Sequence, residues 1–380
     1  MMMTASNQTR RKFYVTALLL ACATLPMSAL AGPLGSSTGM YPRVVRAGDG
    51  PQSPVVASVT AFDNGTHADI FRSDDDGATF TKTGEVRDPD FNTGLCCGGL
   101  YALPIAIGNL KAGTLLYASS VGQGIETAPM QLKIHSSTDQ GKTWTYLSNC
   151  YTAPVNRKGG GLWEVEFLIT KDGKLACLFS DETVPGHSQI LQQSVSSDGI
   201  HWSAPKAIVK LAPPADRPGM PVVTKLNDGR YFMIYEICGP KHNCDVYTRS
   251  SEDGIDWGNP ADVGTFLTTP EGLTLRATPT VALARNPDRL VVTGQRVYKD
   301  GKHQAETGAT VFIDASGTGN GPWRALPAPV DVRNIPADGN VCQNYSTPLL
   351  PSQDGKTLLA VASDYVDGKC RVSAGTAPLP

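Results

Sequence analysis

Two glutamates, Glu164 and Glu236, stand at the ends of apolar segments of similar design and are the first candidates for chemistry. Glu164 opens a short apolar run that a Lys-Asp-Gly turn joins to a second one. Glu236 ends the second apolar run of an equivalent segment, 219–236, which also carries an Asp-Gly turn. Glycoside hydrolysis uses two carboxyl groups, one charged and one protonated. The pair therefore predicts a glycoside-cleaving site, if the fold brings both side chains together.

A third acid, Glu166, lies two positions after Glu164. Side chains alternate along a strand, so Glu166 is expected on the same side as Glu164, and the choice of nucleophile between them stays open. The spacing of the working pair would indicate the outcome of the reaction. A separation of about 5 to 5.5 Å goes with retention of configuration, and about 6.5 to 9.5 Å with inversion.

The elements that position these acids recur along the chain. Six segments contain an apolar strand, a turn and a second apolar strand, and their starts are roughly 55 to 70 residues apart. This is the length of a four-stranded propeller blade with long loops, and the Asp-Gly turns fit hairpins better than helices. The segments start at Tyr41, Leu103, Glu164, Gly219, Ala277 and Ser346.

A second repeat lies between these hairpins. Residues 73–80 and 137–144 match the Ser-x-Asp-x-Gly-x-Thr-Trp pattern called the Asp box, and residues 196–202 and 251–257 are shortened versions. Ser and Asp side chains can satisfy turn amides, Gly can take a positive φ, and the aromatic residue can pack between sheets. We interpret these carboxylates as structural because they recur at equivalent corners.

Together, the six hairpins and the interleaved Asp boxes resemble the six-bladed β-propeller of the sialidase superfamily. The resemblance implies an all-β fold in which the innermost strands line a central channel. Residues 32–380 show no linker or break in composition, so we expect one propeller domain.

Residues 1–31 are predicted to be a signal peptide. Arg10, Arg11 and Lys12 precede an apolar run, and Ala29-Leu30-Ala31 offers a cleavage site of small residues. The basic run is similar to a twin-arginine signal, and a lipoprotein box ending at Cys22 is an alternative to simple cleavage. The mature protein is expected outside the cytoplasm, in the periplasm or the extracellular space.

Eight cysteines remain once Cys22 is removed, an even number that suits an oxidising compartment. The preferred pairs are Cys238 with Cys244 and Cys342 with Cys370. One of Cys96 and Cys97 is expected to pair with Cys150, and Cys177 is expected to be a buried thiol. A strained disulfide between the vicinal Cys96 and Cys97 is a further option.

Composition excludes several classes of partner. The net charge is −2 and charged residues make up 18 % of the chain. Neither value points to nucleic acid or to an anionic membrane as a partner. No apolar run of membrane-spanning length follows the N-terminal segment. The sequence has no CxxC motif and its six His are scattered, so we expect no metal, and no cofactor either. We expect a monomer.

The segments around the two glutamates carry a more specific resemblance. LWEVEF, FSDE followed by HSQ, RPGMPVV and YEICG are similar to motifs of glycoside hydrolase family 93, the exo-α-1,5-L-arabinanases. The resemblance implies a retaining enzyme that releases arabinobiose from the ends of arabinan. It places the nucleophile on Glu164 and the acid/base on Glu236, although Val165 stands where the family motif has Pro.

Further site residues follow from the same resemblance and from the predicted channel. Tyr345 stands where sialidases place a catalytic tyrosine, and it is expected to hydrogen-bond the nucleophile. Trp163 could stack on a sugar face, and the arginines could bind hydroxyls or orient a carboxylate. The candidate substrate-binding residues are Arg43, Trp163, Asp181, His187, Gln189 and Arg217.

Two alternative functions stay open. A sialidase would need three arginines to clamp the substrate carboxylate, and Arg43, Arg217, Arg276 and Arg296 could supply them. That chemistry has no need of Glu164, however, and the sequence offers no clear loop Asp as the acid. A non-catalytic glycan-binding propeller would bind oligosaccharides without turnover.

Overall fold

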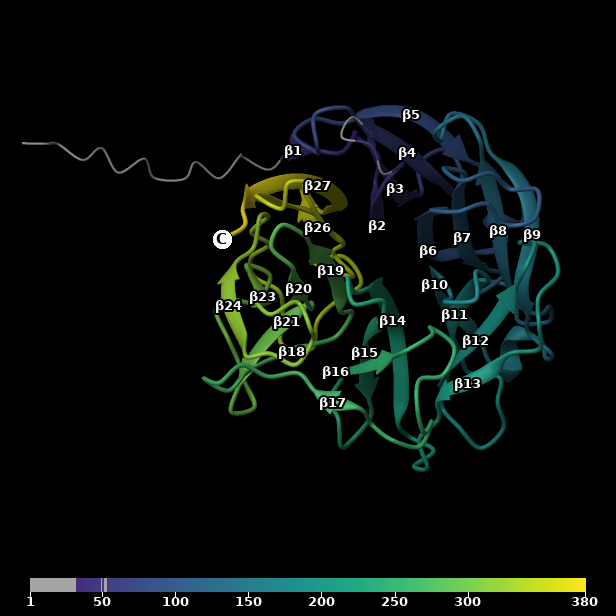
Figure 1. Cartoon of the computed structure of the whole chain (residues 1–380). Helices are drawn as coiled ribbons and strands as arrows, with labels where there is room; N and C mark the ends of the chain where they lie inside the picture. The colour runs from purple at the N-terminus through teal and green to yellow at the C-terminus, as the bar shows by residue number, and fades with distance from the viewer. Residues whose placement is uncertain (1–31, 49, 51–52) are drawn as a thin grey trace, which may run out of the picture.

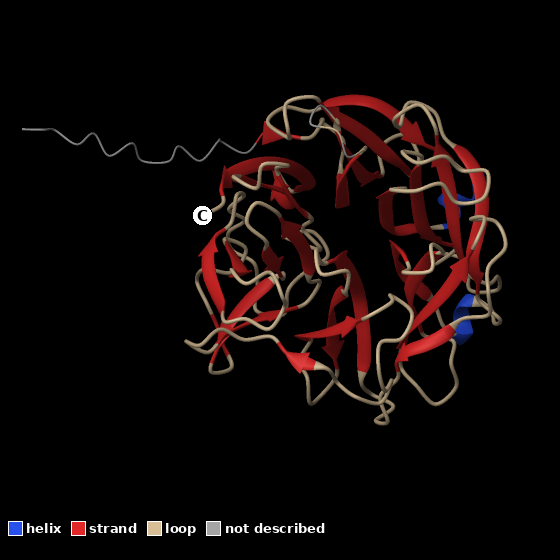
Figure 2. Ribbon diagram, in the orientation of Figure 1, coloured by secondary structure: helices blue, strands red, loops and turns tan. Residues whose placement is uncertain are grey.

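Strands stand around a common centre in the computed structural model, which describes residues 32–48, 50 and 53–380 (Figure 1). The described part is almost entirely strand and loop, with helix confined to the short turns η1 (Pro89–Thr93) and η2 (Arg157–Gly159) (Figure 2). Within this part, no helix has the length and apolar character needed to cross a membrane. The predicted signal peptide, with Cys22, lies outside the described residues.

Three four-stranded antiparallel sheets follow one another along the first half of the chain. They comprise β2 (Gly39–Arg46), β3 (Val55–Ala61), β4 (His67–Ser73) and β5 (Thr81–Val86); β6 (Leu95–Ala102), β7 (Leu115–Val121), β8 (Gln131–Ser137) and β9 (Thr145–Thr152); and β10 (Leu162–Ile169), β11 (Leu175–Asp181), β12 (Ile190–Ser196) and β13 (Lys206–Val209).

The second half of the chain forms three further sheets. The fourth contains β14 (Arg217–Lys225), β15 (Tyr231–Cys238), β16 (Asp245–Ser251), β17 (Thr265–Phe266), β18 (Leu273–Arg276), β21 (Arg296–Lys299) and β22 (Lys302–His303). The fifth contains β19 (Thr280–Ala284), β20 (Arg289–Thr293), β23 (Thr310–Asp314) and β24 (Trp323–Pro327). The sixth contains β25 (Leu349–Pro351), β26 (Thr357–Val366), β27 (Lys369–Pro378) and β1 (Gly32–Pro33).

The innermost strands close a ring. In order along the chain, β2, β6, β10, β14, β19 and β25 each contact the next, and β25 contacts β2. The sixth sheet joins the two ends of the described chain, because β1 pairs with β27. The sequence expectation of an all-β propeller is therefore confirmed.

The fourth sheet departs from the expected set of six alike four-stranded blades. Its strand β17 has only two residues, so β16 also pairs with β18. β18 then pairs with β21, and β21 pairs with β22. The chain thus leaves the fifth sheet after β20, adds β21 and β22 to the fourth sheet, and returns to the fifth sheet at β23. A strand of two residues leaves much of the edge of β16 unpaired, and the later segments cover that edge. Five sheets thus have the four strands of a regular blade, and one is larger.

The strands are apolar because the sheets cover one another on both faces. All seven residues of β3 and all seven of β11 are buried, as expected for short continuous apolar runs. The core is divided into clusters that join neighbouring sheets; one of them joins Leu116 and Leu132 of the second sheet to Phe167 and Phe179 of the third. This packing holds the inner strands, and the side chains at their ends, in fixed positions.

The four Ser-Asp turns share one hydrogen-bond pattern. In the turn at 73–80, the amide of Gly77 donates to Ser73 Oγ, and Asp75 accepts from the amide and hydroxyl of Thr79. In the turns at 137–144, 196–202 and 251–257, a glycine amide likewise donates to the Ser hydroxyl oxygen. The Ser hydroxyl donates to the Asp carboxylate, and that carboxylate also accepts from a backbone amide. Their carboxylates therefore serve the turns themselves.

Four disulfides occur in the described part of the chain. The expected pairs Cys238–Cys244 and Cys342–Cys370 are confirmed. The expected pairing of Cys150 with Cys96 or Cys97 is wrong, as is the free thiol at Cys177. Cys150 on β9 and Cys177 on β11 pack in the same core between two sheets and pair there, which leaves the vicinal Cys96 and Cys97 to pair with each other.

Candidate active site

Glu164 and Glu236 flank one glycine, Gly219, at the start of β14. Gly219 pairs directly with Glu236 of β15. A Cβ atom built on Gly219 would lie 3.7 Å from Oε1 of Glu236 and 3.6 Å from Oγ of Ser180. That hydroxyl donates to Oε2 of Glu164 at 2.5 Å. The two glutamates, which lie in neighbouring sheets and 72 positions apart in the sequence, are therefore brought to the same place.

A bulge in β10 positions Glu164. The pairing register of β10 with β11 shifts between Trp163 and Glu166, and Glu164 itself has a φ of +54°. A non-glycine residue in this left-handed region is uncommon, and such residues concentrate at functional sites. Here the bulge directs the carboxyl group towards Ser180 and towards the amide of Met220, which donates to Oε2 at 3.3 Å.

The same device recurs on the other inner strands. Tyr41, Cys97 and Met220 lie in the register shifts of β2, β6 and β14, and all have a positive φ. Thr278 and Ser346, just before β19 and β25, also have a positive φ. The ring therefore carries at least one left-handed residue near the same end of each inner strand, around the two glutamates.

Glu236 is held from the opposite side. The amide of Thr278 donates to its Oε2 at 2.6 Å, and Oε1 lies 3.5 Å from Sγ of Cys238. Cys238 is bonded to Cys244, which closes the short loop that follows Glu236. The disulfide and the amide together fix the end of β15.

The surroundings of the two carboxyl groups shift their pKa values. Burial, and then the nearby charge of Glu164, raise the pKa of Glu236 to about 7 against the opposing effects of the Thr278 amide, Arg296 and Arg217. Burial also raises the pKa of Glu164, but its bonds from Ser180 and Met220 and the charge of Arg217 favour the ionised form. The arrangement suits a protonated Glu236 facing a charged Glu164.

Glu166 lies apart from this pair, contrary to the expectation from strand alternation. Because the bulge intervenes, its Oε1 accepts from the amide of Val223 at 3.2 Å, further along β14. Glu166 lines a cavity of about 310 Å³ within the ring, among apolar residues from all six inner strands, together with Arg43 and Tyr101. Burial raises the pKa of Glu166 to about 7.

Tyr345 lies close to both glutamates of the pair. Burial, and then the charges of Glu164 and Glu236, raise the pKa of its hydroxyl well above the ordinary value. Its ring packs 6.0 Å, centroid to centroid, from the ring of Tyr41, which sequence reasoning did not select. Burial raises the pKa of Tyr41 to about 12. Both phenols are therefore neutral groups beside the pair.

Two candidate arginines hold parts of the protein itself. Arg43 lies 4.1 Å above the ring of Tyr41 and donates to the carbonyl and hydroxyl oxygens of Ser346. Arg217 donates to Glu182 and Gln189, each at 2.8 Å. Arg43 thereby holds the left-handed Ser346, and Arg217 holds the loop that follows β11.

The other substrate-binding candidates, Gln189, Trp163, His187 and Asp181, differ in their burial and contacts. Gln189 is buried and donates to the carbonyl oxygen of Pro218, so it positions the start of β14, while Trp163 is half-buried next to Glu164 and His187 is partly exposed after β11. Asp181 does not reach the site. It is fully buried and accepts hydrogen bonds from Thr183 and Gln192, because it lies on β11, a strand covered on both faces.

Sequence reasoning missed the groups that hold the glutamates. Ser180, Met220 and Thr278 contact the two carboxyl groups directly, yet only the Ser180 hydroxyl does so through a side chain. Ser180 and Met220 fall within the motifs quoted above, which was the available signal. Thr278 acts through its amide, which residue type does not reveal.

One cluster of metal-ligating residue types is present in the described part of the chain, away from this site. His67, Asp69 and Glu85 bring their ligand atoms within 4.8 Å of one another. The ammonium of Lys82 lies 2.6 Å from both Asp69 and Glu85. The cluster is therefore an internal ion-pair network.

Comparisons with known proteins give strong matches only among solved structures. No family model matches the chain, and no curated protein matches it. An α-L-arabinanase of Penicillium chrysogenum, complexed with arabinobiose, is 25 % identical with a TM-score of 0.75, and the match covers 93 % of this chain and 99 % of that one.

Two further structures share the fold. The GH93 α-L-arabinofuranosidase of Fusarium graminearum with arabinobiose is 22 % identical with a TM-score of 0.75, over 92 % of this chain and 97 % of that one. A Hadza microbial sialidase is 14 % identical with a TM-score of 0.55, over 90 % of this chain and 66 % of that one. By structure, the chain is strongly similar to the arabinanase and the arabinofuranosidase and more distantly similar to the sialidase.

Proposed function

We propose that the protein is a retaining glycoside hydrolase that acts on the ends of α-1,5-linked L-arabinan and releases arabinobiose. The observation that carries the proposal is the placement of Glu164 and Glu236 on either side of Gly219, in surroundings that favour one charged and one protonated carboxyl group. The structural likeness to an arabinanase and an arabinofuranosidase, both in complex with arabinobiose, supports the substrate class.

The hydrogen bonds suggest which oxygen atoms react. Both bonds to Glu164 reach Oε2, so Oε1 is the atom that attacks the anomeric carbon. The amide of Thr278 holds Oε2 of Glu236, so Oε1 carries the proton that passes to the leaving oxygen. The anomeric carbon then forms an ester bond to Glu164 as the glycosidic bond breaks. Glu236 next takes a proton from water, and that water releases the sugar from Glu164.

Tyr345 and Tyr41 assist as neutral phenols. Their raised pKa values keep their protons in place next to the two acids. Tyr345 is therefore suited to donate a hydrogen bond to the charged nucleophile. Three of the arginines that a sialidase would use have partners within the protein, Arg276 being bonded to Asp245, so the geometry does not favour that function.

The test is incubation with linear debranched arabinan, followed by chromatography of the products and proton NMR of the first anomer released. Arabinobiose as the sole early product, with retained configuration, is the expected result. A ladder of sizes would replace exo with endo action, and an inverted anomer would overturn the double displacement. No product, with release of sialic acid from a reporter glycoside, would move the function to a sialidase.

Export is expected from the four disulfides.

A further inference from the structure

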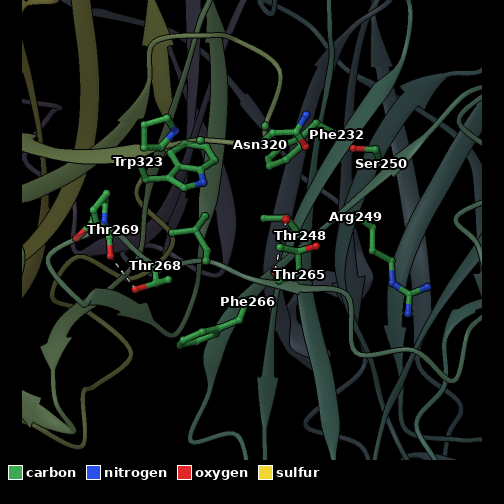
Figure 3. Close-up of a pocket in the computed structure, with 15 residues that line it drawn as sticks. Phe232, Thr248, Arg249, Ser250, Thr265, Phe266, Thr268, Thr269, Asn320 and Trp323 are labelled. Carbon is green, nitrogen blue, oxygen red and sulfur yellow. Dashed lines mark hydrogen bonds between the residues drawn. The ribbon is translucent and has the colours of Figure 1, made fainter.

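A second cavity opens between the fourth and fifth sheets, away from the two glutamates. It has a volume of about 380 Å³, which is in the lower range for ligand pockets. Phe232 forms part of its wall and lies four residues before Glu236 on β15, about 13 Å along the strand. In Figure 3, Thr268 and Thr269 lie to the left of Trp323 and Phe266, and Thr248 and Thr265 lie to their right.

The wall of the cavity depends on a close approach of the two sheets. Gly319, with a φ of +84°, precedes β24, and a Cβ atom built on it would lie 2.3 Å from the ring of Phe232. Only glycine fits there without moving the ring. Phe266 of β17 forms part of the cavity and is 41 % exposed, with its ring 5.6 Å from that of Tyr247.

The lining offers no free charge. Its single charged side chain is Arg249, and that guanidinium donates to the carbonyl oxygens of Ile208, Trp257 and Asp262. In Figure 3 the guanidinium group extends away from the other labelled side chains. An ionic ligand would find no partner of opposite charge in this cavity.

The lining is instead rich in neutral hydrogen-bonding groups. Ser250, Thr265 and Asn320 are exposed, and their side chains make no hydrogen bond to the described residues of the protein. Thr248 and Thr268 donate to backbone carbonyl groups and keep acceptor capacity. Neutral hydroxyl and amide groups beside an exposed aromatic ring match a ligand that has many hydroxyl groups and an apolar face.

We propose that this cavity is a second binding site for a neutral polysaccharide chain. Its occupant is a segment of the same arabinan chain whose end the two glutamates cleave; this identity rests on the proposed function, whereas the neutral, hydroxylated class rests on the lining alone. Phe266 packs against the sugar rings, and Thr265 and Asn320 bind hydroxyl groups. The site holds the polymer at the side of the propeller.

The test measures binding separately from cleavage. In a Glu236→Gln background, affinity electrophoresis in gels containing debranched arabinan is expected to give about fivefold weaker binding for Phe266→Ala and for Thr265→Val, the worth of one or two modest contacts. Thr265→Val keeps the shape of the side chain and guards against misfolding. Tyr146→Ala, at another exposed aromatic residue on β9, is the matched control and should bind as the parent does.

The outcomes separate the two proposals. Parent-like retardation of both cavity variants, with normal thermal unfolding, would overturn the second site even if the wild type cleaves arabinan. Retardation lost in both variants would support the site even if the wild type cleaves nothing. Binding of polygalacturonate that both variants lose would contradict the neutral class. In the active background, both variants should cleave the polymer more slowly and leave arabinotriose cleavage unchanged.

Discussion

Glu164 and Glu236 differ in the hydrogen bonds that they accept, and at the scale of the residue this difference sets their expected roles. Glu164 has a hydroxyl and an amide on one oxygen and Arg217 nearby, all of which favour its charge. Glu236 has one amide, and the charge of Glu164 acts against its ionisation. The proposed mechanism therefore assigns the attack to Glu164 and the protonation to Glu236.

Replacing each acid by its amide isostere should therefore separate these roles. Glu236→Gln is expected to lower kcat on arabino-oligosaccharides by about 10² to 10⁴-fold, and by less for an aryl glycoside whose leaving group needs no proton. Glu164→Gln should lower kcat by about 10³-fold or more on both substrates. Steady-state kinetics with the two substrates provide the measurement.

Glu166→Gln is the matched control for these variants, since its side-chain oxygen can still accept from the amide of Val223. Its kcat should stay within about threefold of the wild type. A loss as large as that of Glu164→Gln would instead make Glu166 the nucleophile and reject the assignment above.

The pH profile is the second prediction at this scale. Glu236 must carry a proton for the first step, and its pKa lies at about 7, so kcat/KM should fall as the pH rises through about 7. The acid limb should lie above the usual range of a glutamate, because burial raises the pKa of Glu164. An alkaline limb near pH 4 to 5, the range of an ordinary glutamate at about 4.3, would contradict the role of Glu236.

At the scale of the element, the left-handed residues of the inner strands turn amides towards the two acids. Ala277 and Thr278 are consecutive residues with φ of +62° and +46°, and only Pro279 separates them from β19. Their conformation directs the amide of Thr278 to Glu236. Each non-glycine residue in this region costs about 1 to 2 kcal/mol, which the contacts between sheets must offset.

Ala277 provides a test of this device. Ala277→Gly should keep kcat and leave stability within about 1 kcal/mol of the wild type, because relief of backbone strain offsets the lost methyl group. Ala277→Val should lower kcat, because a β-branched residue at positive φ displaces the Thr278 amide. Loss of that amide should also move the alkaline limb of kcat/KM to higher pH, since the amide lowers the pKa of Glu236.

Thermal unfolding and pH–rate profiles of both variants supply the measurement. If Ala277→Val merely unfolds at a lower temperature, with kcat and the alkaline limb unchanged, the amide has no role in positioning the acid.

The sequence could predict those elements that depend on nearby residues. The hairpins, the Ser-Asp turns and the Cys238–Cys244 loop all depend on residues within a few positions of one another. The bulge at Glu164 shifts the register of β10, so strand alternation placed Glu166 wrongly, and the carboxyl group of Glu164 contacts Met220, a residue of the next sheet. The Cys150–Cys177 pair and the enlarged fourth sheet likewise depend on contacts between sheets, which local sequence does not encode.

At the scale of the whole molecule, the ring gathers three glutamates whose pKa values are raised: Glu164, Glu166 and Glu236. Two of them serve the proposed reaction, but Glu166 only joins β10 to β14 through the amide of Val223. The burial of Glu166 therefore lowers the free energy of unfolding by an amount that depends on pH. This dependence can be measured without changing the two acids of the proposed reaction.

The direction of this dependence follows from the shift. An unfolded glutamate has a pKa of about 4.3, and burial raises the pKa of Glu166 to about 7 in the folded protein. The folded state holds the proton more tightly, so this contribution to stability is full below pH about 4.3 and is lost as the pH rises through about 7. The side chain of Glu166→Gln does not ionise, so this variant does not lose stability as the pH rises through the same range.

The free energy of unfolding of Glu166→Gln should therefore rise relative to the wild type between pH 5 and pH 8. The expected gain is on the order of 1 to 2 kcal/mol, less than the full shift implies because solvent reaches part of the side chain. Denaturant unfolding at both pH values measures it, with Glu126→Gln, at an exposed position, as the control that should show no change. An equal difference at the two pH values would mean that Glu166 ionises as freely in the folded ring as in the unfolded chain, and its carboxylate would then be a solvated group of the channel.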